Sequence, residues 1–163
     1  MATLVLGIGN PGRGDDALGL EVARRLHGRV PAGVQVREHG GDGAALLDAF
    51  QGFSHVILVD ALRGGAQAGD IVRLDASTAP LPARLGGTST HLLGVAEAVE
   101  LARVLGQLPQ RILVLGVEGL AFTPNAPLSA PVALAVDAAV AAVLAELQLC
   151  ASTHESAPPR SVP

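Results

Sequence analysis

The sequence predicts an α/β protein, a three-layer sandwich with a mostly parallel, doubly wound sheet of about five strands. Short apolar runs alternate with segments of helical period along the chain, which is the pattern of β-α-β units. Three of these runs are continuously apolar rather than alternating, as in strands that helices cover on both faces. Right-handed crossovers then most simply place the first strand between the second and the third.

The elements of the first part of the chain follow from these patterns. Residues 4–8 are predicted to be a buried strand, because the run is continuous and β-branched. Residues 15–27 are predicted to be a helix, since apolar side chains recur at i, i+4 and i+8 and two aspartates stand at its start. Residues 34–38 alternate like a strand. Residues 43–51 form a short helix, and residues 55–59 form the next fully apolar strand.

The middle of the chain continues the alternation. Residues 71–74 form a weaker strand that suits a sheet edge. Residues 76–87 hold two prolines and two glycines, which indicates a loop. Residues 90–105 are predicted to be a helix with one apolar face and a glycine just past its end. Residues 111–117 form the third continuously apolar strand.

The last part of the chain is predicted to be a loop, a helix and a tail. Residues 118–128 form a proline-rich loop, and Pro131 suits the first turn of the following helix. Residues 151–163 are rich in proline and serine and are expected to be a disordered tail, which leaves residues 1–150 as one domain. The buried stripe of the last helix is predicted to be Val132, Val136, Val140, Val143 and Leu147.

Composition excludes several classes of protein. Of the 163 residues, 49% are hydrophobic and 16% are charged, so extensive disorder is excluded. The chain has no lysine and a net charge of −4, which gives no electrostatic reason to bind nucleic acid. The apolar stretch 126–149 contains two prolines and two acids, Asp137 and Glu146, which argues against a membrane span.

The cysteine content and the first residues of the chain indicate in which cellular compartment we expect the protein. Cys150 is the single cysteine, so neither an internal disulfide nor a cysteine metal cluster is possible, in agreement with a reducing compartment. The start of the chain lacks a basic region, and Gly7 and Gly9 interrupt its apolar run too early for a signal peptide. We therefore expect a cytoplasmic protein that contacts no membrane.

Acidic and imidazole side chains are predicted to gather at the carboxyl edge of the sheet, where open α/β sheets bind ligands. Asp15 and Asp16 follow the first strand, Asp60 ends the third strand, and His91 begins a helix. Two carboxylates and an imidazole suit Ni, Zn, Mn or Fe, with coordination positions left open. Each residue also has a simpler explanation, because the aspartates can cap a helix and the histidine can be merely exposed.

The glycine-rich turn at residues 7–14 does not favour a nucleotide site. Its glycines lack the G-x-G-x-x-G spacing of dinucleotide-binding loops, and Pro11 interrupts them. The acids that follow would repel a pyrophosphate, and a chain without lysine has no Walker A loop.

Five motifs in a fixed order carry a resemblance to a known family. Within residues 3–148 they resemble the hydrogenase maturation endopeptidases, which process the C terminus of the large subunit of nickel-iron hydrogenases. The motifs are Gly7-Ile8-Gly9-Asn10 with Gly14-Asp15-Asp16-Ala17-Leu18-Gly19, Gly40-Gly41-Asp42-Gly43, Val59-Asp60-Ala61, Ser89-Thr90-His91-Leu92-Leu93-Gly94 and Gly116-Val117-Glu118.

The resemblance implies roles for particular residues. The metal-binding positions of the family match Asp16, Asp60 and His91, with aspartate as the shorter of the two acids that occur at the first position. They would contact nickel that the substrate already carries, and no permanent cofactor is expected. The two aspartates are also the expected catalytic residues of an aspartyl-type or metal-dependent peptidase. Four residues are expected to line the substrate cleft: Gly40, Gly41, Asp42 and Gly43.

The resemblance also implies the partner and the reaction. The partner would be a nickel-loaded hydrogenase large-subunit precursor, from which a short C-terminal extension is removed, and the free enzyme would be a monomer. The sequence shows no Ser-His-Asp arrangement, no H-E-x-x-H motif and no activated cysteine. A water activated by the metal or by a carboxylate is therefore the expected nucleophile.

Three other functions remain as alternatives. A non-catalytic escort that recognises nickel in the precursor would use the same ligands. Peptidyl-tRNA hydrolases resemble the opening Leu6-Gly7-Ile8-Gly9-Asn10-Pro11-Gly12, but this chain has no histidine before His27 and a charge that suits tRNA poorly. A receiver-type signalling domain would need a lysine after its last strand, and this chain has none.

Overall fold

The structure, a computed structural model, describes residues 2–82 and 90–155 as an α/β sandwich. Side chains are described for these residues except 90–93, 154 and 155. In chain order the elements are β1 (Thr3–Ile8), the 3-10 helix η1 (Gly14–Ala17), α1 (Leu18–Leu26), β2 (Val34–His39), α2 (Gly43–Ala49), β3 (His55–Leu62), β4 (Ile71–Asp75), α3 (Thr90–Val104), β5 (Arg111–Glu118) and α4 (Ala130–Glu155).

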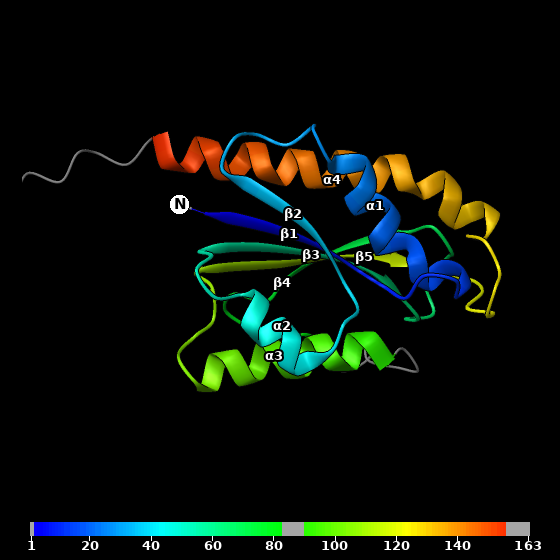
Figure 1. The fold of residues 1–163 in the computed structure, drawn as a ribbon, viewed down its shortest axis with the longest axis horizontal. Helices are drawn as coiled ribbons and strands as arrows, with labels where there is room; N and C mark the ends of the chain where they lie inside the picture. Colours follow the sequence, from blue (N-terminus) through cyan, green and yellow to red (C-terminus); the bar gives the residue numbers. More distant parts are fainter. Residues whose placement is uncertain (1, 83–89, 156–163) are drawn as a thin grey trace, which may run out of the picture.

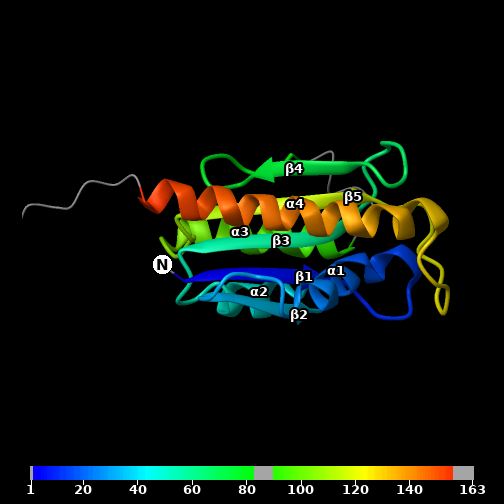
Figure 2. The same ribbon diagram turned by 90° about the horizontal axis from the view of Figure 1, so that it is seen from above.

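The five strands form one mixed sheet in the order β2-β1-β3-β5-β4. Four strands are parallel, and β4 runs antiparallel to β5 at the edge (Figure 2). The predicted mostly parallel sheet of about five strands is therefore confirmed, and so is the position of the first strand between the second and the third. β1 and β3 are buried along their whole length, as their continuous apolar runs predict.

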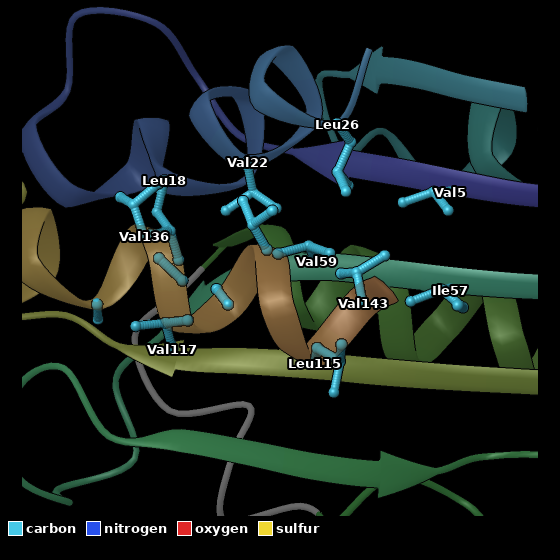
Figure 3. Packing of buried hydrophobic residues seen from close by; sticks show 14 of the residues in the cluster. Val5, Leu18, Val22, Leu26, Ile57, Val59, Leu115, Val117, Val136 and Val143 are labelled. Carbon is cyan, nitrogen blue, oxygen red and sulfur yellow. The ribbon is translucent and has the colours of Figure 1, made fainter. Parts of the chain in front are cut away.

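The helices cover both faces of the sheet, which gives three layers. α1 and α4 lie together on one face, and α2 and α3 lie on the other (Figure 1). Each face has its own apolar cluster, because successive side chains of a strand point to opposite faces. On the α1 and α4 face, valines and leucines of both helices point toward the strands (Figure 3).

The turn after β1 differs from the sequence prediction. The predicted helix at 15–27 is a 3-10 helix over Gly14–Ala17 that leads into the α-helix Leu18–Leu26. The residue before α1 is Ala17, which forms no side-chain cap. Asp15 and Asp16 therefore lie inside the 3-10 turn and do not cap α1, because their side chains are turned into the protein, where both are buried.

Helix α4 is longer than predicted. It continues to Glu155 and so includes the first five residues of the expected tail, where the hydroxyls of Ser152 and Thr153 donate hydrogen bonds to carbonyls one turn earlier. Residues 156–163 of the tail, like 83–87 of the predicted loop, lie outside the described residues. The predicted stripe of five apolar residues is buried against the sheet.

By length and composition, 130–153 in α4 is the one stretch in the described part of the chain that could cross a membrane. Its mean hydropathy is 1.9, and 44% of that window is buried inside the protein. Core helices of water-soluble proteins pass the same test, so length and composition give only weak support for a span. The two acids within residues 130–153 both form ion pairs, Asp137 with Arg25 at 2.6 Å and buried Glu146 with Arg73.

Glycines let α1 approach the ends of β1 and β3 more closely than any other residue would allow. A Cβ atom at Gly19 would lie 2.2 Å from the carbonyl oxygen of Ile8 and 2.4 Å from that of Val59. A Cβ atom at Gly7 would lie 2.0 Å from the carbonyl oxygen of Gly19. The glycine motif of the sequence is therefore explained by backbone packing between a helix and two strands.

Replacing Gly19 tests this packing. Alanine favours helix more than glycine does, yet we expect Gly19→Ala to lower the free energy of unfolding by about 1–3 kcal/mol, because the added methyl group overlaps two carbonyl oxygens. Gly40→Ala is the control, since no atom lies within 4 Å of its Cβ position, and its change should stay within about 0.5 kcal/mol. Urea unfolding measures the free energy of unfolding of both variants. A Gly19→Ala variant as stable as the wild type would contradict the close packing of α1 on the strands.

Candidate functional site at the carboxyl edge of the sheet

Asp60 lies inside β3, near the carboxyl end of the strand. The strand continues two residues beyond it, and the side chain is 0% exposed. Its Oδ1 accepts a hydrogen bond of 2.9 Å from the backbone N–H of Ala61. In the register of the sheet, Asp60 stands beside Gly116 of β5. A fully buried carboxylate at this place needs either compensating interactions or a function, because burial of a charge is costly.

Asp16 comes from the 3-10 turn that follows β1. The turn packs against β3, so the second predicted acid lies on the segment next to the strand that carries Asp60. A Cβ atom at Gly9 would lie 2.1 Å from the carbonyl oxygen of Asp16, which shows how closely the turn rests on the end of β1. Asp16 is buried, with 5% of the residue exposed. The fold therefore brings both predicted acids, each buried, to the same edge of the sheet.

The carboxylate of Asp15 accepts four hydrogen bonds from the segment after β5. Its donors are the backbone N–H groups of Leu120 (2.8 Å), Ala121 (2.9 Å) and Ser129 (2.7 Å) and the hydroxyl of Ser129 (2.8 Å). Burial alone raises the pKa of Asp15, but these hydrogen bonds outweigh it and hold the pKa below its ordinary value. Asp15 is thus an ionised, structurally engaged acid rather than the helix cap that its position suggested.

His91 is the second residue of α3, and its side chain lies outside the described part of the structure. Helix α3 begins at the same end of the molecule as the carboxyl ends of β1 and β3 (Figure 1). Three residues along α3, Gly94 contacts the segment after β2, since its Cβ would lie 2.7 Å from the carbonyl oxygen of Gly41. Gly94, the last residue of the motif that contains His91, therefore packs against the glycine segment at residues 40–43.

Of the four residues predicted to line a cleft, three form the turn between β2 and α2, and the fourth, Gly43, begins α2. Asp42 caps α2, because its side chain accepts hydrogen bonds from the N–H groups of Ala44 and Ala45 at 2.9 and 3.3 Å. The N–H of Gly41 donates to Nδ1 of His39 at 2.9 Å. Gly40 lines an open pocket of about 230 Å³. The other residues that line this pocket are Gly9, Pro11, Leu20, Arg24, Glu38 and His39.

Glu118 is a buried acid at this edge to which the sequence analysis gave no role. Its carboxylate accepts hydrogen bonds from the N–H of Gly64, at 2.9 and 3.0 Å, and from the N–H of Gly65, at 3.0 Å. It therefore holds the loop that follows β3. An acid that ends a continuously apolar strand was the signal that singled out Asp60, and Glu118 ends β5 in the same way.

Carboxylate oxygens are the metal-ligand atoms that this edge of the sheet offers. Carboxylates suit divalent metals, and an imidazole extends the range toward nickel and zinc. Where side chains are described, no group of three histidine, cysteine or acidic side chains is placed to hold a metal ion. Asp16 and Asp60 are the two metal-ligand candidates whose side chains are described, while the third, His91, is placed only through its helix.

Fold and site define an open α/β protein with buried acids at the carboxyl edge of its sheet, and known proteins share the fold. The chain is 29% identical to the Hydrogenase 2 maturation protease of Escherichia coli over 91% of this chain and 92% of the relative. It is 30% identical to the hydrogenase expression/formation protein HupD of Bradyrhizobium diazoefficiens over 79% of this chain and 69% of the relative. The solved hydrogenase maturating endopeptidase HybD of Escherichia coli superimposes with a TM-score of 0.80 at 26% identity, covering 92% and 94% of the two chains.

The family model for hydrogenase maturation proteases matches residues 20–146. The chain belongs to this family and is an endopeptidase of hydrogenase maturation. The resemblance found in the sequence motifs is thereby confirmed.

The hydrogen bonds of Asp15 predict an acid dependence of stability. Because the folded-state pKa is depressed, ionised Asp15 stabilises the fold above its ordinary pKa of 3.8, and this stabilisation is lost as the pH falls through the lower folded value. We expect Asp15→Asn to be less stable than the wild type at about pH 6, with the difference shrinking toward about pH 3. Urea unfolding at several pH values measures the difference, and a gap that stays constant with pH would contradict the assignment.

Proposed function

We propose that this endopeptidase removes a short C-terminal extension from a nickel-loaded hydrogenase large-subunit precursor, with Asp16, Asp60 and His91 contacting the nickel of the substrate. Membership in the maturation protease family supports the substrate class. The observation that carries the assignment of the site is the burial of two carboxylates, 5% and 0% exposed, at one edge of the sheet.

Nickel recognition follows from the chemistry of these donors. Two carboxylates and an imidazole leave coordination positions open, so they can approach a metal whose remaining ligands come from the substrate. A precursor without nickel would offer no such contact and would be cut slowly. The nickel is therefore part of the substrate, and the enzyme needs no metal of its own.

Peptide hydrolysis at this site uses water as the nucleophile. A carboxylate, Asp16 or Asp60, takes a proton from the water as its oxygen bonds to the scissile carbonyl carbon. The C–N bond then breaks, and the proton passes to the leaving amine. The glycine segment at residues 40–43 supports the cleft assignment, because glycines allow close approach of a substrate backbone.

The non-catalytic escort that the sequence left open would recognise nickel through the same three residues. Binding of the precursor is common to both functions, but loss of the C-terminal extension belongs only to the protease. Family membership favours the protease.

Intact-mass spectrometry of the precursor separates these functions. We expect the wild type to remove a C-terminal peptide from the nickel-loaded precursor and to leave a matched nickel-free precursor uncut. Asp16→Ala and Asp60→Ala should reduce the cleavage rate at least about a hundredfold, as loss of a group that acts in the transition state does.

Asp48→Ala is the control, because it removes an exposed carboxylate of α2 and should cut like the wild type. Equal cleavage of both precursors would contradict nickel recognition. Normal cleavage by Asp16→Ala and Asp60→Ala would contradict the site. Binding without any cleavage by the wild type would instead favour the escort.

A further inference from the structure

We infer that Asp15 is a positioning residue: it fastens the turn that carries Asp16 to the segment after β5 and so fixes where Asp16 meets the substrate. The inference rests on the proposed function, in which Asp16 contacts the substrate. The segment involved, residues 119–129, is called here the β5–α4 loop, and it connects the end of β5 to the start of α4.

The carboxylate of Asp15 accepts four hydrogen bonds, and all four donors belong to this loop. Its Oδ2 accepts from the N–H groups of Leu120 and Ala121 and from the hydroxyl of Ser129, while its Oδ1 accepts from the N–H of Ser129. The bonded residues lie at both ends of the β5–α4 loop. The buried carboxylate of Asp15 therefore joins the two ends of the loop to each other and to the 3-10 turn.

Backbone hydrogen bonds also join the 3-10 turn to the β5–α4 loop. The N–H of Asp15 donates to the carbonyl of Ala121 at 2.8 Å, and the N–H of Gly14 donates to the carbonyl of Ala126 at 3.1 Å. Gly14 has a φ of +57°, and a Cβ atom there would lie 2.5 Å from the carbonyl oxygen of Ala121. Only glycine allows this approach without strain.

The β5–α4 loop also contacts the segment that follows Asp60. The N–H of Gly119 donates to the carbonyl of Leu62 at 2.9 Å. The guanidinium of Arg63 lies over the ring of Phe122, 4.0 Å from its centre. The loop thus connects the segment that carries Asp16 with the strand that carries Asp60, and the carboxylate of Asp15 joins the loop to the turn.

An amide at position 15 would disturb this arrangement without changing its size. In Asp15→Asn, one of the two accepting oxygens becomes an NH₂ group, which faces at least one N–H donor in either orientation. The loop and the turn then separate at that donor, because a buried donor without an acceptor is costly. Asp16, the next residue, shifts with the turn.

A double-mutant cycle tests this role. The kcat/KM for the nickel-loaded precursor is measured for the wild type, Asp15→Asn, Asp16→Asn and the double variant, all at a temperature where circular dichroism shows each to be folded. We expect Asp15→Asn to lower kcat/KM at least about tenfold, and the double variant to be no slower than Asp16→Asn alone. If the two losses multiply instead, Asp15 does not act through Asp16 and the inference is wrong.

Glu146→Gln is the matched control for general destabilisation. Glu146 is another buried carboxylate, on α4, bound by Arg73 and lying 3.7 Å from Arg111, and it belongs to neither of the two segments that Asp15 joins. We expect it to lower the thermal midpoint and to leave kcat/KM unchanged. An Asp15→Asn variant that loses stability in the same way but keeps its full kcat/KM would overturn the inference.

Ser129→Ala is a milder second variant, needed if Asp15→Asn does not fold. It removes the hydroxyl donor and keeps the backbone donor, so we expect a loss of about two- to fivefold in kcat/KM that disappears in the Asp16→Asn background. A loss that persists in that background would contradict the inference. If Asp16→Asn itself cuts like the wild type, the proposed function fails rather than the positioning role alone.

Discussion

The close backbone contact between helix α1 and the carboxyl ends of β1 and β3 is the constraint on which the site depends. Gly7, Gly9 and Gly19 have no Cβ atom to hold the segments apart, so the carbonyl oxygens of Ile8 and Val59 lie against the start of the helix. The 3-10 turn before the helix is thereby pressed onto β3. This contact brings Asp16 to the edge of the sheet near which Asp60 lies in β3.

Of the four buried acids described at this edge, Asp15, Glu118 and Asp60 have different surroundings, and their roles differ accordingly. Asp15 and Glu118 accept backbone hydrogen bonds from the β5–α4 loop and from the loop after β3, and each holds one connection in place. Asp60 is buried within the sheet itself. The edge is therefore built from loops that carboxylates hold in fixed positions, which suits a site that must present its own acids with defined geometry.

The fold could be predicted because its signals are local. Continuous apolar runs identified β1, β3 and β5, and the handedness of crossovers fixed the place of β1. The start of α1 was predicted wrongly, since aspartates before a helix usually cap it, whereas here they turn into the protein. The partners of Asp15 lie more than a hundred residues away, and no local pattern reveals such contacts. The helical end of α4 was missed because its polar composition resembles that of a tail.

Part of the candidate site could also be predicted, because some of its signals are local in the sequence. An acid that ends an apolar strand is visible in a sequence, so Asp60 was found, and the same signal at Glu118 was given no role. The position of Asp16 depends on the glycine contact, which the sequence shows only as a motif. The relation of Gly94 to Gly41 depends on the packing of α3 against a distant turn, which tertiary structure alone shows.

Nickel K-edge X-ray absorption tests the central claim most directly. The spectrum of a nickel-loaded large-subunit precursor would be recorded alone and after rapid mixing and freezing with the wild type, Asp16→Ala or Asp60→Ala. The account predicts that the wild type adds oxygen or nitrogen ligands to the nickel and that each variant adds fewer. A nickel coordination shell that is the same with and without the wild-type enzyme, in a complex shown to have formed, would contradict it.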